Sequence, residues 1–325
     1  MNVRRQYISG VAVAAVTALG LGTLSACSGS AAAGNTEKFD VVASFYPMAY
    51  LAEEIGGDHV NVTSLTEPGQ EPHDLEISAR QTAQLQEADA ALYLKGLQPA
   101  VDEAVAQAGV GTTIDAATLT KLEDHGSLED SHEHAGEEGH AEEEAHSEEE
   151  EHALDPHVWL DPVKYAEVAK GVGAAFEKAD PDHAADYKKN TAALVEKLNG
   201  LDSRFEEGLK NTDSKVFFTN HAAFGYLAER YGLTQEAISG LDPESEPSPA
   251  RIKELQEEAE ADGVTTVFYE TLVSDSTAKT LAKDAGLKTD VLDPVEGITG
   301  KSEGDDYIQV MDANLKALQA ALGAK

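Results

Sequence analysis

The chain has 325 residues, of which 60 are Asp or Glu and 24 are Lys or Arg, and its formal net charge is −36. This charge excludes nucleic acid as a partner, because binding to phosphates needs a basic face, whereas an acidic surface attracts cations. The only cysteine is Cys27, so no disulfide forms within the chain and any bound metal must be held by His, Asp or Glu. The length suits about two domains of ~100–200 residues each.

Residues 1–26 have the layout of a secretory signal peptide. Arg4 and Arg5 precede an apolar run over residues 8–24. This run is too short and too rich in Gly and Ala for a permanent membrane span. The run ends in LSAC (residues 24–27), and this string resembles the lipobox of bacterial lipoproteins. We expect Cys27 to carry the lipid anchor and residues 27–38 to form a flexible tether. The mature protein would then work outside the cytoplasmic membrane, in the periplasm or on the outer face; the alternative is a soluble secreted protein with an incidental cysteine.

Short β-rich runs alternate with helical stretches from residue 39 onward. Candidate strands lie at 40–44, 60–65, 90–94 and 112–115, and candidate helices at 47–55, 79–87 and 99–108. This alternation predicts a parallel sheet built from right-handed crossovers. We assign residues 39–180 to an N-terminal α/β lobe.

Residues 123–152 do not fit this alternation. They include 14 acidic residues and six histidines but no Lys or Arg, and few bulky apolar side chains. Such a stretch cannot bury enough surface to offset the entropy of ordering it, so we expect a disordered loop.

A long helix is predicted within the linking segment 181–212. Asp180-Pro181 is a start signal, and large apolar residues then recur at spacings of mostly three and four on one helix face. A helix of ~29 residues would be about 43 Å long. Gly200 leaves open the alternative of two shorter helices with a turn between them.

A second β-α alternation occupies residues 213–325. Candidate strands lie at 215–219, 235–239, 265–269 and 289–292, and candidate helices at 222–231, 249–262, 276–285 and 305–322. Ser248-Pro249 fits a helix cap followed by proline at the first helical position. The predicted fold class is therefore α/β, with two lobes that each contain a parallel sheet.

Three histidines have unusual local sequences. His73 lies in EPHD (residues 71–74), His157 in DPHVWLDP (155–162), and His221 at the end of FFTNH (217–221). Ligand sites in open α/β sheets lie beyond the carboxyl ends of strands, and His73 and His221 each follow a predicted strand. Taken singly, each histidine is weak evidence, because a lone histidine is more often structural or on the surface.

The strings EPHD, DPHVWLDP and TNHAAFGY, in this order, resemble the three histidine motifs of the zinc-binding solute-binding lipoproteins of ABC transporters (ZnuA-like, cluster A-I proteins). LDPVEGIT (residues 292–299) resembles the acidic motif near the C-terminus of that family, and an acidic, His-rich insertion before DPHVWLDP is also typical. The resemblance covers residues 39–325. It implies two α/β lobes joined by one rigid long helix, with the metal site between the lobes.

The resemblance also implies a ligand set. His73 and His157 from the N-terminal lobe, with His221 and a carboxylate from the C-terminal lobe, would bind Zn²⁺. Imidazole nitrogens suit tetrahedral zinc, whereas manganese favours sites rich in oxygen. Related manganese proteins typically have a carboxylate where this chain has His221, so zinc is favoured.

The fourth ligand has several candidates. We favour Glu296 because the pattern Pro-x-Glu-Gly-x-Thr is intact, and Asp293, Glu71 and water are the alternatives. Each ligating ring should donate its other N–H to an acceptor, and acidic residues near His73 and His157 could serve. These acceptors are Asp74, Asp155 and Asp161. Many relatives have an acidic residue directly after the third histidine, where this chain has Ala222.

The histidines of the acidic loop form a possible accessory metal site. They are His125, His132, His134, His140, His146 and His152. Several weak ligands on a flexible chain raise the local zinc concentration without one defined geometry, so we interpret the loop as a collector that binds zinc more weakly than the main site. The alternative is a solvated acidic linker whose histidines are incidental.

The function implied is an extracytoplasmic protein that captures Zn²⁺ and delivers it to an ABC-type permease. The expected partners are that permease and Zn²⁺ itself, with a zinc metallochaperone as an open possibility, and the expected oligomeric state is a monomer. A zinc-dependent hydrolase is the first alternative, since three histidines on zinc with an open position activate water. No general acid, base or nucleophile motif accompanies the site, so we do not expect an enzyme. A surface adhesin or zinc buffer is the second alternative.

Overall fold

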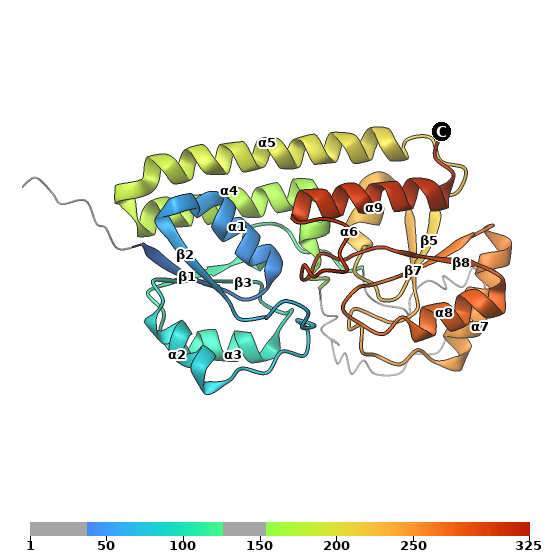
Figure 1. The fold of residues 1–325 in the computed structure, drawn as a ribbon, viewed down its shortest axis with the longest axis horizontal. Helices are drawn as coiled ribbons and strands as arrows, with labels where there is room; N and C mark the ends of the chain where they lie inside the picture. The colour runs from blue at the N-terminus through green and yellow to red at the C-terminus, as the bar shows by residue number, and fades with distance from the viewer. Residues whose placement is uncertain (1–37, 126–153) are drawn as a thin grey trace, which may run out of the picture. The chain divides into compact units, whose positions relative to one another are not determined.

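The computed structural model describes residues 38–125 and 154–325 and contains two four-stranded sheets, each with helices on both faces (Figure 1). The prediction of two α/β lobes with parallel sheets is therefore confirmed. The predicted signal peptide, Cys27 and five of the loop histidines lie outside the described residues. None of the described helices is long and apolar enough to span a bilayer.

The first sheet has the strand order β2-β1-β3-β4, and its strands run parallel. Its strands are β1 (Phe39–Ala43), β2 (Val60–Ser64), β3 (Ala90–Tyr93) and β4 (Thr112–Asp115), and its helices are α1 (Tyr46–Gly56), α2 (Ala79–Glu87) and α3 (Pro99–Ala108). Side chains alternate between the faces of the sheet. Val41 and Ala43 join the core beneath α1, whereas Val42 joins the cluster beneath α2 and α3. Burial on both faces explains why the central strands β1 and β3 are mostly apolar, whereas the edge strands β2 and β4 contain more polar residues.

The second sheet repeats this arrangement, with the strand order β6-β5-β7-β8. Its strands are β5 (Val216–Thr219), β6 (Thr234–Ala237), β7 (Thr266–Tyr269) and β8 (Lys288–Val291), and its helices are α6 (Gly225–Tyr231), α7 (Pro249–Ala261), α8 (Ser276–Ala285) and α9 (Tyr307–Leu322). Phe218 and Val267 pack against α7 and α8, whereas Phe217 and Phe268 belong to the larger core shared with α5 and α9.

Two predicted helix starts were wrong in the second lobe. The helix predicted from residue 222 begins at Gly225, because residues 220–224 form a turn in which the Ala222 N–H bonds to the carbonyl of Gly240. The helix predicted from residue 305 begins at Tyr307, since the Asp306 side chain accepts the N–H of Gln309 and caps it.

Helix α5 (Ala184–Leu209) is the long element that contacts both lobes. It has 26 residues, about 39 Å at 1.5 Å per residue, and follows a 3₁₀ turn at Pro181–His183. It continues through Gly200, so the single-helix prediction is confirmed and the two-helix alternative is wrong. One face of α5 is buried, and it packs on α1 and on α9 (Figure 1).

Helix α4 (Pro162–Ala179) lies alongside α5 and was not among the predicted helices. Its first turn is capped by Asp161, whose carboxylate accepts the N–H groups of Val163 and Lys164. The small residue Gly173 faces α5, and a Cβ at this position would overlap Thr191 Oγ1. Because Thr191 is β-branched and its hydroxyl donates to the carbonyl of Tyr187 at 2.7 Å, it has little freedom to move away.

We predict that Gly173→Ala lowers the free energy of unfolding by ~1–3 kcal/mol through overpacking. Gly200→Ala is the matched control, because its nearest neighbour would be the Arg204 guanidinium at 3.6 Å. That substitution should raise the free energy of unfolding by ~0.5–1 kcal/mol, since alanine favours helix over glycine. Urea unfolding followed by circular dichroism measures both, and stabilisation of the Gly173 variant would contradict the close-packing argument.

Candidate metal centre

Four predicted site residues meet at the carboxyl ends of strands from both sheets. His73 lies in the loop after β2, His221 directly after β5, and Glu296 in the loop after β8, while His157 precedes the 3₁₀ turn that leads into α4. One ligand atom from each residue lies within 4.8 Å of every other. His157, His221 and Glu296 are buried, and the His73 side chain is 10% exposed.

The distances around Glu296 match those of a small tetrahedral site. Glu296 Oε1 lies 3.4 Å from His73 Nε2, 3.4 Å from His157 Nε2 and 3.6 Å from His221 Nε2. These separations are too long for good hydrogen bonds, and within the described residues the Nε2 atoms of His157 and His221 have no hydrogen-bond partner. Four ligands at ~2.0–2.1 Å from a tetrahedral ion lie ~3.3–3.4 Å apart. The spacing of Glu296 Oε1 from the three Nε2 atoms therefore suits one ion the size of Zn²⁺.

Two of the rings are held from behind by buried carboxylates. His157 Nδ1 lies 2.8 Å from Asp155 Oδ1, and His221 Nδ1 lies 2.5 Å from Glu270 Oε1. When Nδ1–H donates to a carboxylate, the lone pair of Nε2 is left to face a metal. Asp155 was among the predicted acceptors, whereas Asp161 caps α4.

Glu270 was missed by the sequence analysis. It immediately follows β7, the neighbour of β5 in the sheet, so the position was available as a signal. Glu270 supplies a buried acceptor for His221, although the position directly after that histidine is Ala222.

The charges of the site compensate one another. Burial lowers the pKa of His221, but the Glu270 and Glu296 carboxylates outweigh it and raise that pKa to about 10. Burial also lowers the pKa of His157, yet Asp155 and Glu296 raise it overall. Burial raises the pKa of Glu296, but the three imidazoles hold it well below its ordinary value. A divalent cation at the centre would compensate the carboxylate charges in place of the protonated imidazoles, and the rings would release protons.

The turn that carries Glu296 is strained and held at both sides. Val295 is buried and has φ of 59°, a left-handed conformation that is rare for a β-branched residue. Asp293 Oδ1 accepts the N–H of Val295 at 2.8 Å, and the Trp159 indole donates to the carbonyl of Pro294 at 2.7 Å. The strain is thus offset by bonds that point Glu296 into the cluster.

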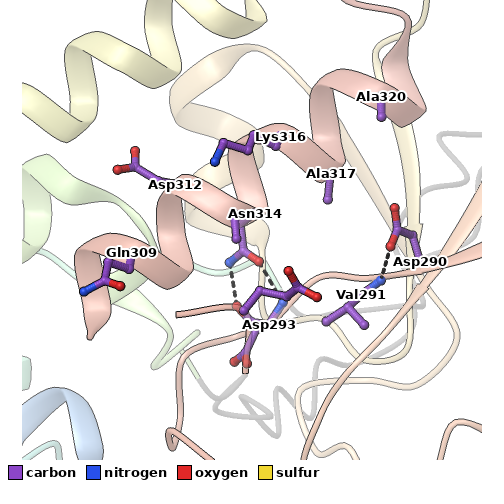
Figure 2. A pocket seen from close by; sticks show the side chains of 11 residues that line it. Asp290, Val291, Asp293, Gln309, Asp312, Asn314, Lys316, Ala317 and Ala320 are labelled. Carbon is purple, nitrogen blue, oxygen red and sulfur yellow. Dashed lines mark hydrogen bonds between the residues drawn. The ribbon is translucent and has the colours of Figure 1, made fainter. Parts of the chain in front are cut away.

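Asp293, the second candidate for the fourth ligand, is not brought into the cluster. Its backbone N–H donates to Asn314 Oδ1 and its carbonyl accepts from Asn314 Nδ2, beneath α9 (Figure 2). Its carboxylate also accepts from Thr271 Oγ1 at 3.2 Å. Asp293 lines a separate cavity of about 540 Å³ beside α9 and shapes the turn of Glu296.

Glu71, the third candidate, is engaged by its own loop. Its two carboxylate oxygens accept the backbone N–H groups of His73 at 3.0 Å and Asp74 at 3.2 Å. Burial, only partly offset by the His73 ring, raises the pKa of Glu71. Glu71 therefore orders the backbone that presents His73.

The fold and the site define a two-lobed α/β metal-binding protein with a three-histidine, one-glutamate centre between the lobes. Residues 41–321 match the family model described as zinc-uptake complex component A, periplasmic, and the chain belongs to this family. The resemblance inferred from the histidine motifs is thereby confirmed. Membership in a family of uptake components also agrees with the expectation of a binding protein and not an enzyme.

Known relatives support this assignment. The chain is 38% identical over 302 residues to the zinc-binding lipoprotein AdcA of Streptococcus pneumoniae, covering 91% of this chain and 58% of AdcA. It is 36% identical to the high-affinity zinc uptake system protein ZnuA of Bacillus subtilis, covering 93% and 94%. The crystal structure of the Zn(II)-bound ZnuA-like domain of S. pneumoniae AdcA is 36% identical, has a TM-score of 0.71, and covers 88% of this chain and 99% of that domain. The chain thus spans a little over half the length of AdcA.

We predict that Trp159→Phe lowers the free energy of unfolding by ~1–3 kcal/mol, because it leaves the buried carbonyl of Pro294 without its donor. Urea unfolding with a chelator present excludes any contribution from bound metal.

Tyr307→Phe tests the same junction, because the Tyr307 hydroxyl donates to the carbonyl of Trp159 at 2.5 Å. A double-mutant cycle of the two substitutions should give a coupling energy of at least ~0.5 kcal/mol. Strict additivity would show that the two hydrogen bonds do not act as one unit.

Proposed function

We propose that this chain captures Zn²⁺ outside the cytoplasmic membrane and delivers it to an ABC-type permease. The observation that carries the proposal is the convergence of three Nε2 atoms on Glu296 Oε1 at 3.4–3.6 Å. His73, His157, His221 and Glu296 are the proposed ligands. Three nitrogens and one oxygen in a small tetrahedral arrangement favour zinc over manganese, which prefers sites rich in oxygen and of higher coordination number.

Glu296 is the proposed fourth ligand. Its second oxygen, Oε2, is buried without a hydrogen-bond partner among the described residues, as expected for a carboxylate that is completed by a cation. A protein ligand at the fourth position leaves no open coordination site for water, which argues against the hydrolase alternative.

The proposal extends to the ends of the chain and to its lobes. Membership in a family of periplasmic uptake components supports an extracytoplasmic location. Removal of residues 1–26, lipid on Cys27 and a tether over residues 27–38 remain proposals. So do zinc collection by the loop histidines, a monomeric state, and division into lobes at 39–180 and 213–325 with the linking segment 181–212.

Release of zinc is proposed to begin with the loop that carries His73. The lobes are joined by α5 and by hydrogen bonds from Trp159 to Pro294, from Tyr307 to Trp159 and from Tyr226 to Asp155. His157, His221 and Glu296 are anchored in this junction. His73 is the most exposed of the four ligands and is ordered mainly by Glu71. Movement of one loop therefore opens the site without separation of the lobes.

Two experiments test the function. Competition titration with a zinc chelator should give one tight zinc equivalent per chain, and Glu296→Gln should weaken it at least ~100-fold by removing the only anionic ligand. Glu260→Gln changes an exposed residue on α7; it is the control and should leave the affinity for zinc unchanged.

In a host that lacks other zinc importers, deletion of the gene should prevent growth under zinc chelation, and added zinc should restore it. Normal growth of that deletion strain would overturn the transport proposal.

We predict that Glu270→Gln weakens the tight zinc equivalent by ~10–100-fold, because the His221 ring loses the anion that orients it and raises its basicity. The same competition titration measures the change, and thermal unfolding without metal checks that the variant is folded. Unchanged affinity in a folded variant would show that packing alone orients His221.

A further inference from the structure

A second group of metal-ligating side chains lies outside the central site. Glu123, His125 and Glu229 each place one ligand atom within 4.8 Å of the others. Glu123 and His125 belong to the start of the acidic stretch 123–152, and both have defined contacts with the folded part of the chain. Glu229 lies on α6 of the other lobe.

The side chain of His125 packs against Gly225 and Tyr226 of α6. Its ring lies 4.4 Å from the ring of Tyr226 at 81°, and its side chain is only 16% exposed. Gly225 leaves the space that the histidine fills, because a Cβ there would overlap the Cβ of His125 and lie 3.0 Å from Asp155 Oδ2. The Tyr226 hydroxyl also accepts the backbone N–H of Glu123 at 2.8 Å. The histidine is thus positioned by the fold.

The ring of His125 has the orientation of a metal ligand. Nδ1 lies 3.0 Å from Asp155 Oδ2, and Nε2 lies 2.8 Å from Glu229 Oε2. A carboxylate behind Nδ1 and an anionic group in front of Nε2 is the arrangement already described for His157 and His221. The proton between Nε2 and Glu229 is the one that a metal would replace.

Asp155 connects the two groups. Its Oδ1 accepts from His157 Nδ1 at 2.8 Å, and its Oδ2 faces His125 Nδ1 at 3.0 Å. One fully buried carboxylate therefore orients a ring of the central site and a ring of the outer group, and the two Nε2 atoms face different centres.

We propose that Glu123, His125 and Glu229 bind a second divalent cation of the zinc class, and that this outer site shares Asp155 with the central site. The proposal goes beyond the proposed function and rests on it only in the choice of Zn²⁺ as the probe. One nitrogen and two carboxylates suit zinc, with water completing the coordination, since the Glu229 side chain is 58% exposed.

The outer site binds more weakly than the central one. It offers three protein ligands, and two of them are accessible to water. Lys164 also competes for Glu123, because its Nζ lies 2.9 Å from Glu123 Oε1. A metal ion must displace this ammonium group from the carboxylate, whereas no lysine or arginine contacts the central ligands among the described residues.

The test uses the full chain with His132, His134, His140, His146 and His152 each replaced by Gln, so that these histidines contribute no binding. Competition titration with Zn²⁺ should give one tight and one weaker equivalent. Glu229→Gln should abolish the weaker equivalent and keep the tight one, whereas Glu260→Gln should keep both. Lys164→Met should tighten the weaker equivalent several-fold. A crystal soaked with zinc should give an anomalous peak within ~2.0–2.2 Å of His125 Nε2.

The outcomes separate the two proposals. A weaker equivalent that survives in both the His125→Gln and the Glu229→Gln variants overturns the outer site, as does a single equivalent in the five-glutamine chain. An unchanged weaker equivalent in the Lys164→Met variant removes Glu123 from the site. If the unsubstituted chain binds no tight equivalent of zinc, the proposed function is overturned instead.

Discussion

The site depends on the interaction between the buried carboxylate of Glu296 and the three imidazole rings around it. An isolated buried anion is costly, so its surroundings must supply positive charge or hydrogen bonds. Here the imidazoles supply the charge, and buried Asp155 and Glu270 hold two of those imidazoles in turn. Acid, imidazole and acid alternate outward from the centre. A divalent cation fits this order because it satisfies the inner carboxylate and leaves the outer ones as acceptors.

The fold brings these groups together by placing two sheets of the same topology with their carboxyl strand ends toward a shared junction. Each sheet then contributes loops to the crevice, as is general for open α/β sheets. Helix α5 and the bonds around Trp159 fix the spacing of the lobes. If that spacing changed, Trp159 could no longer donate to the carbonyl of Pro294. The left-handed turn at Val295 would then lose one of the hydrogen bonds that direct Glu296 into the cluster.

Much of this was predictable from the sequence. The strands were placed to within one or two residues. The central strands are short apolar runs, and the alternation with helices located the more polar edge strands. His73, His157 and His221 were recognisable from their motifs. Glu296 was favoured from its intact motif, but the sequence could not decide between it and Asp293 or Glu71, because all three lie in or next to a motif. The choice depends on which carboxylates are engaged by backbone N–H groups, and that is a property of the folded turns.

Contacts between distant segments were also out of reach of the sequence. Glu270 and His221 are 49 positions apart, and only the pairing of β5 with β7 brings them together. Helix α4 was not predicted, although Asp161-Pro162 marks its start. The string DPHVWLDP was interpreted only as a ligand motif, whereas its last two residues cap and begin this helix.

The preformed spacing of the ligands has a consequence for transport. Because Glu296 Oε1 already lies 3.4–3.6 Å from the three Nε2 atoms, close to the ligand spacing of a tetrahedral zinc site, binding requires little rearrangement and the free energy of coordination is retained as affinity. The same feature opposes release, since a rigid site holds its ion. The proposed transport role is therefore easier to fulfil if one ligand is less firmly fixed than the others. His73 has this property: among the described residues no carboxylate is found behind its Nδ1 atom, and its loop is ordered mainly by Glu71. In the proposed release, a partner that displaces this loop would remove one of the four proposed ligands and expose the ion, while the other three would stay in place for the next one.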